Sequence, residues 1–183
     1  IQQKPHKILS ERAKIIFVGN LNNDKRADLL PELVEEIIRK TDKSLSFYIV
    51  GEGKYRNLLE NRFKHIKYET IITGQLSNDK VLKLIGEADI LILPSRREGL
   101  PLVLLEAIAL NTIPIACNVG GVAELLSNDF LVNESDQFIN DFANKVIQML
   151  NNPQHPILEI ANFTWGKIIK TEMEIINQTL HAR

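Results

Sequence analysis

The sequence has one cysteine, Cys117, among 183 residues, which excludes an internal disulfide and a zinc cluster built on several cysteines. A single thiol is typical of a protein from a reducing compartment. Aromatic residues make up only 6%, and the formal net charge is −1, so no overall charge favours DNA, RNA or an anionic membrane. No apolar run approaches the roughly 20 residues that a membrane-spanning helix requires. These absences indicate a globular domain whose ligand contacts are local.

The motifs that would indicate a metal enzyme are also missing. The chain contains no Asp-x-Asp sequence, and its histidines, His6, His65, His155 and His181, are scattered outside every motif. We therefore predict no metal site and no cofactor. The first residues show neither an initiator methionine nor the pattern of a signal peptide, so we interpret the chain as a piece of a longer protein.

The sequence does contain a regular alternation of short β-branched runs with helical patterns. With 44% hydrophobic and 25% charged residues, the chain suits one domain with a buried core. The alternation predicts an α/β fold, a Rossmann-like, doubly wound parallel sheet of about six strands with helices on both faces. The predicted strands cover residues 14–18, 45–50, 68–73, 89–93, 113–116 and 130–132. Helices are expected over residues 28–40, 54–63, 78–87, 101–110, 122–127, 135–150 and about 164–180.

This pattern also divides the chain. We expect residues 14–150 to form the α/β body, residues 1–13 to be an interdomain linker, and residues 151–183 to hold C-terminal helices. In sheets of this kind, ligands bind outside the carboxyl ends of the strands. The segments that follow the predicted strands are therefore the candidate sites.

Glycine turns follow the first two predicted strands. The first begins at Gly19 and carries Lys25 and Arg26, which either approach a phosphate or are ordinary solvated charges. The second, residues 51–53, is only half of a dinucleotide-binding fingerprint, because Arg56 occupies the third glycine position. We reject a nicotinamide-dinucleotide site there and interpret these glycines as a tight turn between a strand and a helix.

The helix after the fourth strand is the most informative segment. Residues 101–110 are apolar except for Glu106, so we expect a buried helix, with Pro101 at its first position and one buried carboxylate. Such a carboxylate costs several kcal/mol unless it is paired. Glu106 either binds a lysine of a neighbouring element or reaches a ligand at the helix N-terminus, where ribose hydroxyls would donate to it. In the second case the free N–H groups of Leu102 and Val103 would bind a pyrophosphate.

Two further segments would border the same cavity. Glu98 and Gly99, in the loop before this helix, would face it, unless Glu98 is simply exposed. After the fifth strand, Gly120 and Gly121 either let backbone amides approach a ligand or only permit a sharp turn. Glu124 suits the dipole of the following helix, so its role is explained by capping alone.

Taken together, these segments resemble glycosyltransferase family 4, whose members are retaining, metal-independent sugar transferases with the GT-B fold. The resemblance rests on Pro94 and Ser95, on residues 98–107 (EGLPLVLLEA), and on residues 114–116 and 120–124. Its two glutamates, Glu98 and Glu106, have seven residues between them, as in the family. Residues 163–165 resemble the family's closing-helix signature. The resemblance covers nearly the whole chain and implies the C-terminal, donor-binding domain of a two-domain enzyme.

The resemblance also implies roles for particular residues. Glu106 would hold the ribose hydroxyls of the donor, and the catalytic residues would be Glu98, at the donor sugar, and Lys25, at the phosphates. The nucleobase is expected at the turn after the third strand, with Leu76 packing on it. The other expected donor-binding residues are Gly19, Asn20, Gly74, Gln75, Gly99, Leu100, Leu102 and Val103.

Two positions depart from the family's pattern. Asn20 stands where the family usually has an arginine, so one phosphate-neutralising charge is missing. The sequence leaves open whether Arg26 replaces it. Pro101 stands where glycine is common, which removes one backbone donor, although other members share this Gly-Leu-Pro version.

By this resemblance the chain would belong to a hexosyltransferase that moves a sugar from a nucleotide diphosphate, UDP being favoured, to an acceptor hydroxyl. The acceptor is expected in surface polysaccharide assembly, such as O-antigen, or on a lipid-linked oligosaccharide. Expected partners are the nucleotide-diphosphate sugar and the N-terminal acceptor-binding domain of the same protein, without nucleic acid. The enzyme would be cytoplasmic, with any peripheral attachment to the cytoplasmic face of the inner membrane carried by the missing half. The isolated domain is expected to be inactive.

Three other functions stay open on the residues alone. A sugar-nucleotide epimerase uses the same fold, but no histidine follows a predicted strand here. A receiver-type signalling domain needs an acidic pair after the first strand, where this chain has residues 19–21, Gly-Asn-Leu. A non-catalytic Rossmann-like binding module is favoured by Asn20.

Overall fold

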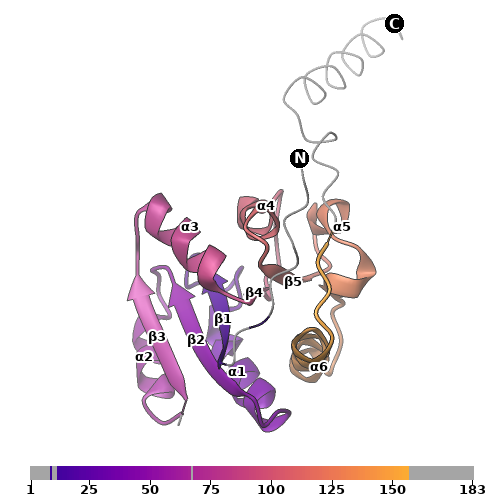
Figure 1. Cartoon of the computed structure of the whole chain (residues 1–183). Coiled ribbons are helices and arrows are strands. Elements are labelled where there is room, and N and C mark those ends of the chain that lie inside the picture. Colours follow the sequence, from indigo (N-terminus) through magenta and orange to yellow (C-terminus); the bar gives the residue numbers. More distant parts are fainter. Residues whose placement is uncertain (1–8, 10–11, 67, 157–183) are drawn as a thin grey trace, which may run out of the picture.

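The computed structural model describes residues 9, 12–66 and 68–156, and these residues contain a six-stranded parallel sheet (Figure 1). The strands lie in the order β3-β2-β1-β4-β5-β6, and each neighbouring pair is parallel. The predicted doubly wound sheet is therefore confirmed. The strands are β1 (Arg12–Val18), β2 (Ser44–Val50), β3 (Glu69–Gly74), β4 (Ile90–Leu93), β5 (Ile113–Cys117) and β6 (Leu131–Val132).

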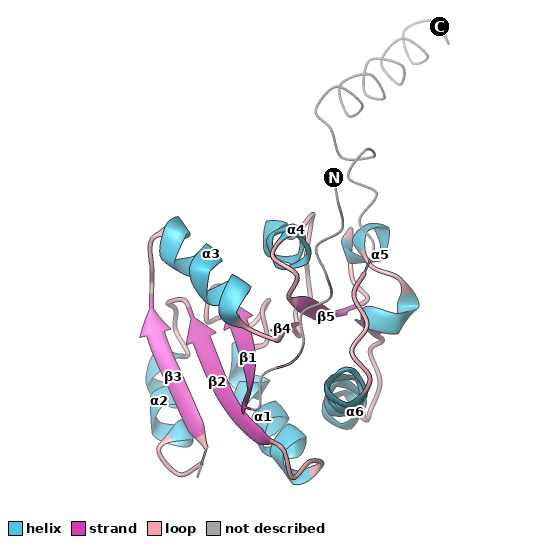
Figure 2. Ribbon diagram, viewed as in Figure 1, coloured by secondary structure: helices cyan, strands magenta, loops and turns pink. Residues whose placement is uncertain are grey.

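Helices cover both faces of this sheet. Figure 2 shows α1, α2 and α6 on one face and α3, α4 and α5 on the other. The helix α1 packs against α2 and α6, and α3 packs against α4. Their bounds are α1 (Leu30–Arg39), α2 (Arg56–Phe63), α3 (Asn78–Glu87), α4 (Leu102–Ala109), α5 (Val122–Leu125) and α6 (Phe138–Asn151), with short 3₁₀ turns at η1 (Ala27–Leu29) and η2 (Asn128–Phe130). Among the described residues, no helix is both long and apolar enough to cross a membrane.

The two covered faces explain the sequence patterns. Every residue of β4 and β5 is buried, because strands in the middle of such a sheet meet helices on both sides. The helix α1 buries a stripe at Leu30, Leu33, Val34 and Ile37, the spacing of one helix face. The edge strand β3 is only partly buried. Packing of the helices onto the sheet therefore forms one continuous core.

Some element boundaries differ from the predictions. The strand β1 begins at Arg12, which pairs with Ser44, so it includes the last two residues of the expected linker. The helix α6 begins at Phe138 and not at residue 135, since the Ser135 hydroxyl accepts the Gln137 N–H at 3.2 Å and holds a turn before the helix. The expected helix at about 164–180 and the motif at 163–165 lie outside the described residues.

The helix α4 is not buried on every side, which corrects the expectation from its sequence. It begins at Leu102, so Pro101 is its N-cap, and it buries only Leu104 and Ala107. Its inner face packs on β5 and α3, whereas Leu102 is 66% exposed. An apolar sequence does not say whether the chain's own core or another surface covers it.

The strand order reverses between β1 and β4, the two central strands. From β1 the chain continues outward to β2 and β3, and from β4 it continues the other way to β5 and β6. In doubly wound sheets, ligands bind outside the carboxyl ends of the strands at this reversal. The predicted residues Lys25 and Glu98 follow β1 and β4, so they lie on either side of it.

Candidate functional site

The side chains of Lys25 and Glu98 meet at the strand-order reversal. Lys25 Nζ donates to Glu98 Oε1 at 2.6 Å and to Oε2 at 2.8 Å, although 73 positions separate the two residues. The Glu98 side chain is 6% exposed and the Lys25 side chain 23%, so the alternative of an exposed Glu98 is wrong. An ammonium group has three N–H donors. One donor of Lys25 therefore remains for another acceptor, such as a phosphate oxygen.

The second carboxylate, Glu106, lies one turn into α4. It is half-buried, and it has no side-chain hydrogen bond or ion pair with any part of the chain that the structure describes. The alternative of a structural pair between Glu106 and a neighbouring lysine is therefore not what the structure shows. A half-buried carboxylate without a partner is available to accept hydrogen bonds from a ligand.

The N-terminus of α4 lies between these two glutamates in the sequence. Its N-cap, Pro101, offers no side-chain hydrogen bond, and the first N–H group that a backbone carbonyl accepts is that of Leu104, bound to Pro101 at 3.0 Å. The N–H groups of Leu102 and Val103 precede it and have no acceptor within the helix. Together with the positive end of the helix dipole, they favour an anion.

Gly120 and Gly121 hold the loop that carries Glu98. Gly120 has a φ of 54°, and a Cβ atom there would lie 1.8 Å from the Glu98 carbonyl oxygen. The Gly121 N–H donates to the Gly99 carbonyl at 3.0 Å, so this amide is already bound and does not face a ligand. The glycines therefore let two loop backbones meet, a role that the sequence interpretation missed, since only the fold shows which backbone approaches them.

Backbone contacts at glycines also join the turns after β1, β2 and β3. The Gly19 N–H donates to Val50 O at 3.0 Å, and the Gly51 N–H donates to Gly74 O at 3.0 Å. A Cβ atom on Gly51 would lie 1.9 Å from the Gly19 carbonyl oxygen. Residues 51–53 form the predicted tight turn, and the missing side chains of Gly51 and Gly53 also let this turn pack directly on the one after β1.

The remaining predicted residues lie along this edge of the sheet. A Cβ atom on Gly19 would lie 3.7 Å from the Lys25 side chain, so Gly19 borders Lys25 directly. Asn20 and Gln75 are exposed, and Leu76 is half-buried against the core. The expected base-binding turn begins at Gly74, the end of β3, two strands and therefore roughly 10 Å from β1. The structure thus brings Gly19, Lys25 and Glu98 together, with the turn expected to bind the base farther along the edge.

Arg26 lies inside the protein and does not replace the arginine missing at Asn20. It is 2% exposed, and its Nη1 donates to the Pro94 carbonyl at 3.3 Å. Its Nη2 pairs with the Glu134 carboxylate. A guanidinium committed to these interior contacts is unavailable to a phosphate at the surface. Nothing in the sequence distinguishes this position from any other basic residue in a loop.

Burial determines the protonation state of Cys117, which lies at the end of β5. Burial raises the pKa of its thiol to about 12, with the nearby Arg26 guanidinium acting in the opposite direction. The thiol is therefore protonated at neutral pH. A protonated thiol is neither a nucleophile nor a metal ligand, and within the described ranges no three His, Cys, Asp or Glu residues come together as a metal-binding group.

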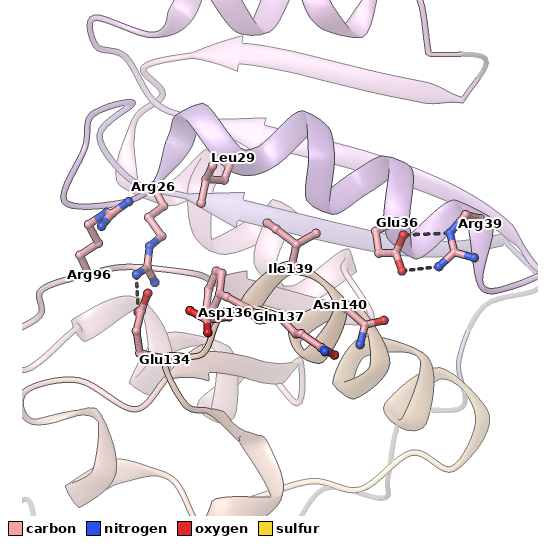
Figure 3. Close-up of a pocket in the computed structure, with 11 residues that line it drawn as sticks. Arg26, Leu29, Glu36, Arg39, Arg96, Glu134, Asp136, Gln137, Ile139 and Asn140 are labelled. Carbon is pink, nitrogen blue, oxygen red and sulfur yellow. Dashed lines mark hydrogen bonds and ion pairs between the residues drawn. The ribbon is translucent and has the colours of Figure 1, made fainter.

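A groove of about 500 Å³ runs between α1 and the start of α6 (Figure 3). None of the donor-binding or catalytic residues predicted from the sequence lines it. Arg26 and Arg96 lie at one end, beside Glu134, and Glu36 and Arg39 form an ion pair at the other. Acidic and basic side chains are mixed along its walls, so it does not favour a ligand of one charge.

The fold and the site define a doubly wound α/β domain with a lysine, two carboxylates and a free helix N-terminus placed at or beside its strand-order reversal. The sequence model of the family described as glycosyl transferases group 1 matches residues 1–160. The chain belongs to this family, and its fold is that of one half of a GT-B glycosyltransferase.

Individual relatives agree with this assignment. The chain is 28% identical over 147 residues to the uncharacterized glycosyltransferase MJ1178 of Methanocaldococcus jannaschii, covering 76% of this chain and 38% of that protein. It is 34% identical over 110 residues to the putative teichuronic acid biosynthesis glycosyltransferase TuaC of Bacillus subtilis, covering 60% and 26%. The pneumococcal O-GlcNAc transferase GtfA, solved in complex with UDP and GlcNAc, superposes with a TM-score of 0.72 at 20% identity over 94% of this chain and 37% of that one. The chain therefore spans less than half the length of these relatives.

Proposed function

We propose that this chain binds a nucleotide-diphosphate sugar, with a UDP-sugar as the favoured donor, for retaining transfer to an acceptor hydroxyl. The observation that carries the proposal is the pair formed by Lys25 and Glu98 at the strand-order reversal. Family membership gives the class of reaction, and UDP in the complex of the structurally similar GtfA supports the choice of nucleotide.

In the proposed mechanism, fixed charges stabilise the departing nucleotide diphosphate. The third N–H of Lys25 and the N–H groups of Leu102 and Val103 donate to phosphate oxygens, where negative charge develops in the transition state. Donors already in position need no reorganisation at that moment. Glu98 fixes the Lys25 ammonium and borders the donor sugar, and Glu106 accepts the ribose hydroxyls. No metal or cofactor takes part in the proposed reaction.

The acceptor side of the site belongs, in this proposal, to an N-terminal domain of the same protein. The relatives are more than twice as long as the matched part of this chain, and Leu100 and Leu102 are apolar but 45% and 66% exposed at the rim of the site. A covering domain would remove both from water. The chain alone should therefore bind the donor and transfer nothing at a useful rate.

The acceptor and the cellular setting are also proposals. The name of TuaC, which refers to teichuronic acid biosynthesis, supports a role in surface polysaccharide assembly, with a lipid-linked oligosaccharide as another acceptor of the same kind. We place the hexosyl transfer in the cytoplasm, with membrane attachment, if present, through the N-terminal domain.

A calorimetric titration of the chain with UDP and GDP tests this function. We expect UDP to bind, and we expect Lys25→Met to weaken its affinity about 10- to 150-fold, since a hydrogen bond to a charged group contributes about 1.5–3 kcal/mol. Lys43→Met is the matched control, because Lys43 is exposed and precedes β2, at the opposite edge of the sheet. The proposal would be contradicted if neither UDP nor GDP binds, or if the Lys25→Met variant and the wild type bind UDP with equal affinity.

A further inference from the structure

Arg26, the residue after Lys25, is buried in an uncommon backbone conformation. Its φ is 48°, in the left-handed region that residues other than glycine rarely adopt. Its side chain is nevertheless 2% exposed and ranks among the largest fully buried side chains of the described chain. A buried guanidinium is expensive unless it is well partnered, so the contacts that compensate this one indicate what it holds.

Those contacts join the carboxyl ends of separate strands. Arg26 Nη1 lies 3.3 Å from the Pro94 carbonyl, after β4, and 3.6 Å from Cys117 Sγ, at the end of β5. Its Nη2 pairs with Glu134, after β6 (Figure 3). The guanidinium carbon lies 4.3 Å from the centre of the Phe138 ring in α6. One side chain from the loop after β1 therefore contacts the carboxyl ends of β4, β5 and β6, the three strands on that side of β1 in the sheet.

Two neighbouring contacts align the same loops. The Arg96 N–H donates to the Asp24 carbonyl at 2.7 Å, and Lys25 pairs with Glu98. Residues 24, 25 and 26 therefore each contact the segment 94–98, at positions 96, 98 and 94 respectively. Arg26 makes the buried contact of the three, and the other two lie nearer the surface.

We propose that Arg26 is a positioning residue, which fixes the Lys25 loop against the Glu98 loop so that the ammonium stands ready for a diphosphate. This inference rests on the proposed nucleotide-sugar binding. A lysine side chain is flexible, and anchoring its backbone reduces the entropy lost when it binds a ligand. The effect of Arg26 on binding is then exerted through Lys25, although Arg26 itself touches no ligand.

Hydrogen exchange of the ligand-free chain tests the positioning directly. In the Arg26→Met variant, we expect the Arg96 amide, which donates to the Asp24 carbonyl, to exchange at least about 10-fold faster than in the wild type. Exchange at Ile49, in the core strand β2, should stay unchanged. Arg39→Met is the matched control. Arg39 lies at the other end of the groove between α1 and α6, where its side chain is 68% exposed and paired with Glu36. This change should leave the Arg96 amide protected. Equal acceleration at Ile49 and Arg96, or no change at Arg96, would overturn the proposal.

A double-mutant cycle with UDP separates positioning from general stability. Arg26→Met should weaken binding about 10-fold in the wild-type background and less than about 2-fold when Lys25 is already methionine. Similar losses in both backgrounds, or no loss in the wild type, would contradict an effect through Lys25. If Arg26→Met fails to fold, Glu134→Gln, which removes the partner and keeps the arginine, enters the same cycle with the same expectation. If the wild-type chain binds no UDP, the proposed function fails, and the exchange measurement still decides whether Arg26 holds the Lys25 loop.

Discussion

Replacement of Glu106 by alanine should weaken UDP binding about 10- to 150-fold and leave the domain folded. The expected loss corresponds to one charged hydrogen-bonding partner, about 1.5–3 kcal/mol. The fold should survive because the Glu106 carboxylate has no hydrogen bond or ion pair within the described part of the chain, so its removal leaves no buried partner unsatisfied. Calorimetric titration measures the affinity, and thermal unfolding checks the fold.

Glu35→Ala is the matched control for this change, because Glu35 is an exposed glutamate in α1, a helix on the other face of the sheet. It should bind UDP with wild-type affinity. If Glu106→Ala instead unfolds the domain, or if it folds and retains its affinity for UDP, then the carboxylate serves the structure and not the ligand.

Gly120→Ala should destabilise the domain by about 2–4 kcal/mol and abolish measurable UDP binding. A Cβ atom at Gly120 would lie 1.8 Å from the Glu98 carbonyl oxygen, which is backbone and cannot rotate away. The φ of 54° adds the cost of a left-handed conformation, about 1–2 kcal/mol. Relief of the clash requires the Glu98 loop to move, and this separates Glu98 from Lys25. Urea unfolding measures the stability, and calorimetry the binding.

Gly86→Ala provides the opposite expectation for the same chemical change. Gly86 lies within α3, and a Cβ atom there would meet only the Leu110 side chain at 3.8 Å, an ordinary contact. Alanine should therefore stabilise the domain by up to about 1 kcal/mol through its higher helix propensity. Equal stability of Gly120→Ala and the wild type would show that the two loops do not pack as closely as the structure has them.

The sheet could be predicted from the sequence because local patterns determine it. β4 and β5 are apolar at consecutive positions, as strands buried on both faces must be. The alternation of strands and helices then restricts the topology to a doubly wound sheet. Element ends were less predictable, since a single side chain such as Ser135 moves the start of α6 by three residues.

The site could be predicted only in part, because its contacts join residues far apart in the sequence. Lys25 and Glu98 were named as site residues, but no pattern shows that their side chains meet. The pair formed by Arg26 and Glu134 spans 108 positions, and it was missed for the same reason. The exposure of Leu102 was missed because hydrophobicity predicts that a side chain avoids water and does not identify what covers it.

Mapping UDP onto the chain with NMR shows whether a nucleotide diphosphate binds at the strand-order reversal. A titration of the ¹⁵N-labelled chain should shift the backbone amides of Lys25, Gly99, Leu102 and Val103, and that of Gln75 in the turn expected to bind the base. The amides that line the groove between α1 and α6, such as Asn140, should not move. Shifts confined to that groove, or no shifts at saturating UDP, would show that the nucleotide does not bind at the strand-order reversal.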